Sequence, residues 1–226
     1  MLRHAAALGL DEDLQAADKA RELLGKSRHV ATNIPAMAWA DVPGFCASRE
    51  EPTQTHLALR LLMLTGLRST PLRTLRLNQI EGDVWTVPAE AMKGRKGATE
   101  AFRVPLSREA RRVIDLVRPH ARNGFLFANA RQGVISDMTL SRHMERRGLE
   151  ARPNGFRTSL RTWLAEATDA PHEVAETMLG HVVDGNVVRA YRRTDFLEQR
   201  RVLVERWADH VTGGAGQVVQ LAGAAR

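Results

Sequence analysis

The apolar residues of this chain fall into blocks whose spacing predicts mostly helices. Residues 53–65 (TQTHLALRLLMLT) form a strongly apolar run that is long enough for a buried helix, and Gly66 is suited to end it. Three short segments have the pattern of strands, and together with the helices they predict an α+β fold, mainly α, with a small three-stranded antiparallel sheet. The further helical patterns cover residues 108–117, 139–147, 156–167, 171–179 and 195–209, and the strand patterns cover residues 75–80, 84–87 and 102–106.

The segments outside these blocks predict turns and connectors. Residues 11–24 have a helical pattern but no partner bundle, and the prolines within residues 31–44 predict an extended connector between two domains. Thr70 is suited to cap a helix that has Pro71 at its first position, so Arg68 is expected in the preceding turn.

The composition favours a polyanionic partner without establishing one. The formal net charge is +7 and the sequence pI about 10.6, which suits binding to phosphates, although basic residues also simply keep a surface solvated. Cys46 is the single cysteine, and we find neither an apolar run near 18 residues nor a charged leader followed by an apolar stretch. We therefore expect a cytoplasmic protein without a membrane segment.

Lysine is rare enough for its positions to be informative. Four of the 33 basic residues are lysines and the other 29 are arginines. Lys93 and Lys96 lie three residues apart in a Gly-rich segment, residues 93–98, which we expect to be a hairpin tip. A guanidinium stays charged at any working pH, so a lysine at such a place is a candidate for releasing a proton.

Five short blocks carry the residue types that phosphodiester chemistry needs. In chain order they are TGLR with Arg68, MKGRKG with Lys93, NGFR with Arg157, LGH with His181 and AYRR with Tyr191. Taken singly, such an arginine is usually a surface charge, such a histidine a helix cap and a lone tyrosine a core residue. Their order resembles the signature of the tyrosine recombinases of the phage integrase family, and four of the five blocks match it fully.

The resemblance extends over nearly the whole chain. Segments such as GDVWTVPAEAMKGRKG, AEATDAPHEVAETMLGH and AYRRTDFLEQRR are similar to integrases of prophages and genomic islands. It implies that residues 1–45 are the C-terminal helix and linker of an incomplete core-binding domain, residues 46–212 a tyrosine recombinase catalytic domain, and residues 213–226 a flexible tail. It also implies site-specific DNA recombination, that is, integration or excision of a mobile element.

The resemblance assigns a catalytic role to each block, and the chemistry supports the assignment. Strand cleavage needs a nucleophile, positive charge on the non-bridging oxygens and a proton for the leaving oxygen. Tyr191, the only tyrosine, would form a 3′-phosphotyrosyl intermediate. Arg68 and Arg157 would clamp the phosphate, His181 would hydrogen-bond to it, and Lys93 would protonate the leaving 5′ oxygen.

The same resemblance defines the partners. Double-stranded DNA is the expected substrate, bound by a homotetramer, with no metal, no nucleotide cofactor, no small-molecule substrate and no membrane. Arg95, Lys96, Arg192 and Arg193 are the expected DNA-binding residues, and Lys96 is the alternative proton donor if the hairpin register differs.

Two positions depart from the family pattern. Asn154 stands where the family usually has the first histidine of its His-x-x-Arg block, and an amide cannot take up a proton at neutral pH. Pro71 stands where many members have a carboxylate that braces the first arginine. We therefore expect slower cleavage than in other members of the family, and some other support for Arg68.

Three other functions remain open at this point. The chain could be a DNA-binding remnant of an integrase that has lost catalysis, a nicking enzyme similar to type IB topoisomerases, or a helical protein-interaction domain with an incidental basic surface. Covalent capture on DNA, relaxation of supercoiled plasmid and the salt dependence of DNA affinity separate these possibilities.

Overall fold

The chain divides into two units in the computed structural model, Met1–Asn33 and Ile34–Arg226, which are described separately. The structure describes residues 7–9, 13, 15–24, 33–47, 53–93, 100–131, 133–181 and 194–213. In the first unit, the predicted helix is found as α2 (Ala16–Leu24), which begins later than its pattern suggested.

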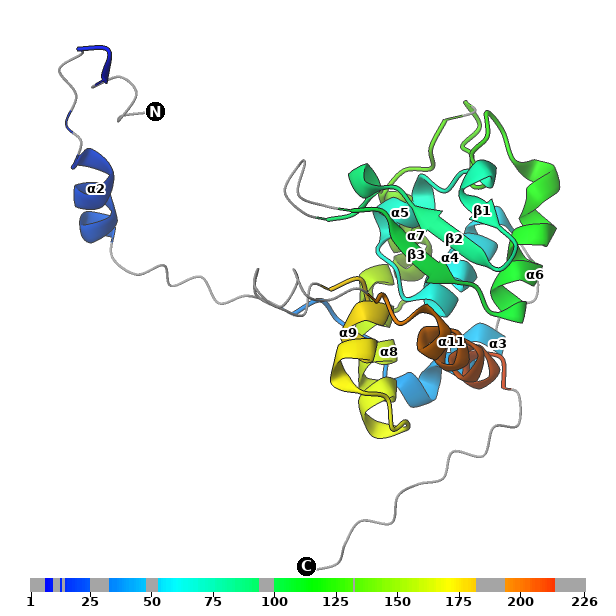
Figure 1. Ribbon diagram of the computed structural model, residues 1–226. Coiled ribbons are helices and arrows are strands. Elements are labelled where there is room, and N and C mark those ends of the chain that lie inside the picture. Colours follow the sequence, from blue (N-terminus) through cyan, green and yellow to red (C-terminus); the bar gives the residue numbers. More distant parts are fainter. Residues whose placement is uncertain are drawn as a thin grey trace, which may run out of the picture. The chain divides into compact units, whose positions relative to one another are not determined.

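The second unit is mainly helical with one small antiparallel sheet, which confirms the predicted fold class (Figure 1). The strands follow each other in the order β1-β2-β3, and Trp85 of β2 pairs with Ile80 on one side and with Val104 on the other. The helices are α3 (Val42–Ala47), α4 (Gln54–Thr65), α5 (Ser69–Arg73), α6 (Arg108–Val117), α7 (Met138–Arg146), α8 (Phe156–Glu166), α9 (His172–Met178) and α11 (Leu197–Val211). The strands are β1 (Ile80–Glu81), β2 (Val84–Val87) and β3 (Phe102–Pro105), and short 3-10 turns include η1 (Trp39–Asp41), η2 (Leu77–Gln79), η3 (Ala89–Ala91) and η5 (Pro153–Gly155).

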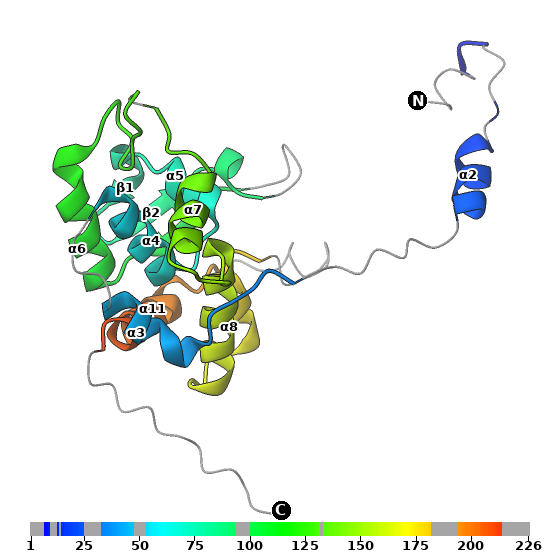
Figure 2. The ribbon, with the colours of Figure 1, turned by 180° about the vertical axis from the view of Figure 1, so that it is seen from behind.

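Helix α4 forms the centre of this unit. Its N-cap Thr53 accepts a hydrogen bond from the backbone N–H of His56, and Gly66 ends it in the left-handed conformation, with φ of 61°. The helix contacts α5, α6, α7, α8 and α11, and Figure 2 shows it among these neighbours from behind. Its almost continuous apolar sequence follows from this position, because a helix surrounded by others has little surface left for water.

One predicted strand is wrong over most of its length. Of residues 75–80, only Ile80 enters the sheet, because Arg76 and Gln79 close the 3-10 turn η2: the N–H of Gln79 donates to the carbonyl of Arg76, and the N–H of Arg76 donates to Oε1 of Gln79. The backbone before this turn pairs with residues 124–126 instead: Leu77 donates to the carbonyl of Gly124, and the carbonyl of Leu75 accepts from Leu126.

Two predictions about helix starts are also wrong. Residues 39–44, predicted to be extended, form η1 and the start of α3, because Pro43 lies in the first turn of α3, where its missing N–H costs no hydrogen bond. Helix α5 begins at Ser69 with Arg68 as its N-cap residue, so Thr70 is not the cap. Pro71 is the third helical residue, where the N–H also has no partner within the helix.

The chain before α3 packs against the start of α8. Arg152 donates its backbone N–H to the carbonyl of Pro35 at 3.0 Å, and Ser159 donates its hydroxyl to the carbonyl of Met37. A Cβ at Gly155 would lie 2.3 Å from the oxygen of Pro35, so this approach requires glycine. Residues 34–45 therefore belong to the compact second unit, although the sequence suggested a division after residue 45; the domain assignment itself stays a prediction.

Candidate functional site

Arg157 lies at the point where three segments of the second unit meet. It is the second residue of α8 and only 9% exposed. Its Nη1 donates to the carbonyl of Gly66 at 2.9 Å, its Nη2 donates to the carbonyl of Leu179 at 2.8 Å, and Nη2 also lies 2.8 Å from Nε2 of His181. A guanidinium has five N–H donors, so these contacts within the described residues leave two donors for an added anion.

The C-terminal end of α4 contacts Arg157 through the carbonyl of Gly66. A Cβ at Gly66 would lie 2.4 Å from Cδ2 of Leu160, so α8 packs directly against the glycine backbone. The same glycine has a positive φ, which turns the chain out of α4 and leaves its carbonyl available to Arg157. The sequence TGLR thus contributes a hydrogen-bond acceptor as well as an arginine.

His181 is placed by the way α9 ends. The backbone N–H of His181 bonds to the carbonyl of Glu176, and the N–H of Gly180 bonds to the carbonyl of Thr177, with φ of 63° at Gly180. These two bonds define a Schellman motif, in which glycine takes the left-handed position and the next residue leaves the helix. The ring of His181 is 38% exposed, with Nδ1 at 2.7 Å from Oε2 of Glu176.

Arg68 and Arg157 form a pair of like charges that are partly removed from water. Burial lowers the pKa of Arg68, and no carboxylate of the described residues offsets this effect. Burial also lowers the pKa of Arg157, to about 10, with a further lowering from the charge of Arg68 and an opposing contribution from Glu176. Both groups stay protonated at neutral pH, and a pair of desolvated cations favours binding of an anion between or beside them.

Asn154 contacts Ser69, the residue that follows Arg68. It is in η5, immediately before α8, and its Oδ1 accepts a long hydrogen bond of 3.4 Å from the hydroxyl of Ser69. With its oxygen directed at Ser69, the amide nitrogen is the group that Asn154 can offer as a donor. The structure thus brings together four of the predicted site residues, namely Arg68, Asn154, Arg157 and His181.

The base of the predicted hairpin lies against the turn of His181. Lys93 is exposed and follows Met92, whose Cε would lie 3.0 Å from a Cβ at Gly180. This proximity places the segment after η3, which carries Lys93, beside the Leu-Gly-His block. Arg95 and Lys96 lie outside the described residues.

Tyr191, Arg192 and Arg193 also lie outside the described residues, but the chain that follows them is firmly attached to the sheet. Asp195 forms a bidentate ion pair with Arg103 of β3, with distances of 2.9 and 3.0 Å, and lies 3.4 Å from Arg200. Arg200 is 1% exposed and donates to the carbonyl of Arg103 at 2.8 Å. Burial works to raise the pKa of Asp195, but these arginines outweigh it and hold the pKa below its usual value.

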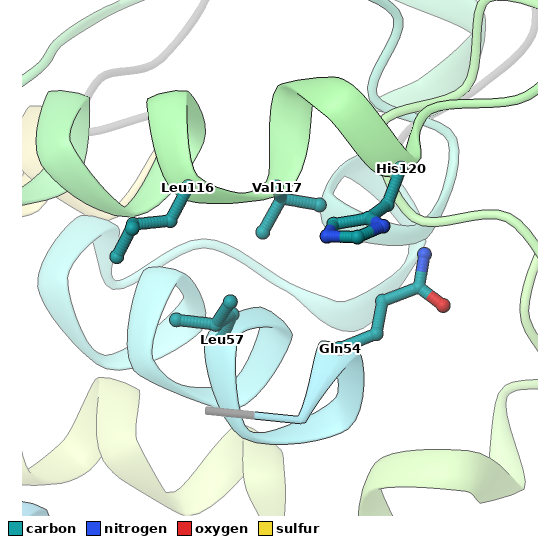
Figure 3. A pocket seen from close by; sticks show the side chains of 5 residues that line it. All are labelled: Gln54, Leu57, Leu116, Val117 and His120. Carbon is teal, nitrogen blue, oxygen red and sulfur yellow. The ribbon is translucent and has the colours of Figure 1, made fainter. Parts of the chain in front are cut away.

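A hollow of about 430 Å³ lies elsewhere, between α4 and the end of α6 (Figure 3). None of its lining side chains is a guanidinium or an ammonium group, so it does not suit a phosphate. The lining residues are Gln54, Leu57, Leu116, Val117 and His120.

The described residues offer neither a metal cluster nor a membrane helix. No group of three or more His, Cys, Asp or Glu side chains is arranged in them to hold a metal ion. Within the same ranges, no helix combines the length and the apolar character needed to cross a bilayer.

The sequence matches the model of the phage integrase family over residues 41–198. The chain belongs to the phage integrase family. This confirms the resemblance inferred from the five blocks. Among curated members of the family, prophage integrase IntZ of Escherichia coli (strain K12) is 32% identical over 77% of this chain and 45% of IntZ. The integrase of Enterobacteria phage P4 is 26% identical over 98% of this chain and 54% of its own length, so the chain spans about half the length of these relatives.

Solved integrases have the same fold. The integrase from mycobacterium phage Brujita covers 84% of this chain and 67% of its own, with a TM-score of 0.59 and 15% identity. A lambda integrase dimer bound to a COC′ core site covers 86% of this chain and 56% of its own, with a TM-score of 0.54 and 19% identity. At these identities the likeness establishes the fold of this member of the phage integrase family.

Two features of the site were missed by the analysis of the sequence. Glu176 and Arg161 form an ion pair at 2.5 Å directly beside His181, yet neither belongs to the five blocks. A usable signal was present, because a Schellman motif ending at Gly180 brings the residue five positions before His181 close to it. The role of Gly66 as an acceptor for Arg157 had no local signal.

Proposed function

We propose that this chain carries the catalytic centre of a site-specific integrase, which breaks and rejoins duplex DNA through a 3′-phosphotyrosyl intermediate on Tyr191. The observation that carries the proposal is the pair Arg68 and Arg157, two partly desolvated cations held together with unused donors. Such a pair stabilises a phosphorane-like transition state better than a ground-state phosphate, because its charge acts where negative charge develops.

The described residues support a division of roles around one phosphate. Three contacts fix Arg157, so its guanidinium defines the position of the phosphate. Arg68, at the start of α5, supplies a second guanidinium that can donate two parallel hydrogen bonds to the phosphate. His181 contacts Arg157 through Nε2, so its ring lies beside the same phosphate. Lys93, exposed beside the turn of His181, is the proposed donor of the proton to the leaving 5′ oxygen. The nucleophile Tyr191 completes the reaction, which needs no metal or nucleotide in this scheme.

We further propose double-stranded DNA as the substrate and a homotetramer on DNA as the working assembly. The net charge of +7 favours phosphate binding, and related folds include a lambda integrase tetramer bound to a Holliday junction. Arg95, Lys96, Arg192 and Arg193 are the proposed contacts to the DNA backbone.

A second candidate is an integrase remnant that binds DNA without cleaving it. Asn154 favours this candidate, because the amide cannot accept the proton of a phenol. The two proposals predict equal DNA affinity and differ only in whether a covalent bond forms.

Covalent capture on nicked duplexes tests the proposed function directly. A pool of random-sequence duplexes with a nick would trap the intermediate, because the short 5′-hydroxyl strand diffuses away and cannot reverse the reaction. We expect a protein–DNA adduct that survives denaturation, and sequencing of the captured DNA would give the preferred site. Binding that weakens steeply with salt, with no adduct at any DNA excess, would support the remnant instead.

Replacing Asn154 by histidine is expected to accelerate single-turnover cleavage by about tenfold or more, since a positioned general base typically contributes about 10²–10⁴. The rate of adduct formation measures the effect. Asn154→Gln keeps an amide and serves as the matched control, for which no gain is expected. A histidine variant no faster than the parent would contradict the idea that Asn154 limits proton transfer.

A further inference from the structure

Glu176 is the middle member of a chain of contacts that ends at the phosphate-clamping Arg157. Its Oε1 accepts from Nε of Arg161 at 2.5 Å, and its Oε2 lies 2.7 Å from Nδ1 of His181. The side chain is 18% exposed. Each carboxylate oxygen thus has its own partner, and Nε2 of His181 in turn lies 2.8 Å from Nη2 of Arg157.

These contacts decide which nitrogen of His181 carries the hydrogen. A guanidinium can only donate, so Nε2 of His181 accepts from Arg157 and carries no hydrogen. Burial works to raise the pKa of Glu176, but hydrogen bonds from His181 and Arg161 outweigh it and hold the pKa below its usual value. The ionised carboxylate can only accept, so the hydrogen of the neutral ring is on Nδ1.

Building on the proposed function, we propose that Glu176 is a positioning residue that fixes the ring of His181, with Nδ1 held as a donor and Nε2 held as an acceptor for Arg157. Without an acceptor at Nδ1, the ring would be free to turn and to move its hydrogen to Nε2. Arg161 restrains Glu176 from the other side, because it occupies the second oxygen. The arrangement follows the general rule that a histidine's distal partner sets its tautomer and orientation.

The fold offers a matched control one turn earlier in α9. Glu173 is exposed and lies on the same helix, so Glu173→Gln removes an equal charge without touching His181. Glu176→Gln keeps the size of the side chain and removes its charge. The backbone carbonyl of Glu176 that closes the Schellman motif is unchanged in either variant.

The tautomer of His181 is measured by nitrogen NMR of the histidine rings in the full chain, with His181→Gln used to assign the signal. We expect the parent and Glu173→Gln to show the hydrogen on Nδ1. Glu176→Gln is expected to show a mixture of tautomers, because an amide can donate as well as accept. An unchanged tautomer in Glu176→Gln would overturn the inference, whether or not the chain cleaves DNA.

Single-turnover adduct formation on the nicked-duplex pool gives the second readout. Glu176→Gln is expected to slow it by about ten- to hundredfold, by analogy with removing the hydrogen-bond partner of a metal-bound histidine. Since Glu176 acts through His181, the double variant with His181→Gln should be no slower than His181→Gln alone. Additive losses would show that Glu176 acts by another route and would overturn the inference.

The two proposals fail in different ways. No adduct with the parent, together with a shifted tautomer in Glu176→Gln, would contradict the recombinase function and leave the coupling of the two side chains established. An adduct with the parent that forms equally fast in Glu176→Gln would remove Glu176 from the site and leave the function intact.

Discussion

Tyr191→Phe is expected to abolish the covalent adduct completely while leaving DNA affinity unchanged. Phenylalanine keeps the aromatic ring and removes only the hydroxyl, and the chain has no other tyrosine that could replace it. Without the phenol oxygen no ester bond to phosphorus can form, so the effect is a loss of reaction and not a change of rate. Denaturing gels of the nicked-duplex reaction measure the adduct, and equilibrium titration measures the affinity.

Peptide mapping of the parent adduct provides the control. The DNA must be attached to the peptide that contains Tyr191, because attachment through a serine or a histidine would indicate a different mechanism. An adduct that persists in Tyr191→Phe would rule out the phosphotyrosyl intermediate, even if the parent cleaves DNA efficiently.

Arg157→Gln and Arg68→Gln are expected to lose cleavage to a similar extent, by about 10²–10³, because each removes a donor to the transition state. Their effects on the free energy of unfolding should differ. Arg157→Gln leaves the buried carbonyls of Gly66 and Leu179 without their donor, at about 1–3 kcal/mol for each. Arg68→Gln removes a like charge from the surroundings of Arg157, so its free energy of unfolding should equal or exceed that of the parent.

Urea unfolding and single-turnover cleavage, measured on the same preparations, check this pair. Arg68→Gln is the cleaner probe of catalysis, since its loss of activity cannot be attributed to a weaker fold. If Arg68→Gln unfolds as readily as Arg157→Gln, then Arg68 stabilises the fold and the cation pair is not a preformed anion site.

Local sequence was sufficient for most of the helices. Helix α4 could be predicted because its apolar run and its Thr53 cap lie within one segment, and α6 because Ser107 caps a strongly amphipathic pattern. Residues 75–80 could not, since their backbone pairs with residues 124–126, far along the chain. Likewise, α3 forms at Pro43 because Val42 and Cys46 are buried, which no local pattern indicated.

For the site, too, one part could be predicted from the sequence and another part could not. The order of the five predicted catalytic residues along the chain was enough to indicate the family. A signature of this kind depends only on residue types and their spacing, which are read directly from the sequence. What supports Arg157, by contrast, depended on three acceptors that come from two distant segments, the end of α4 and the end of α9.

By itself, the sequence therefore determined the fold class and the family, and it predicts which groups react, because these depend on local periodicity and on the kinds of residue present. The tertiary structure alone decided that Arg157 is held by two distant segments, that Glu176 accompanies His181, and that Arg68 has no acidic partner among the described residues. The physical reason is that orientation, desolvation and charge pairing depend on which distant segments pack together.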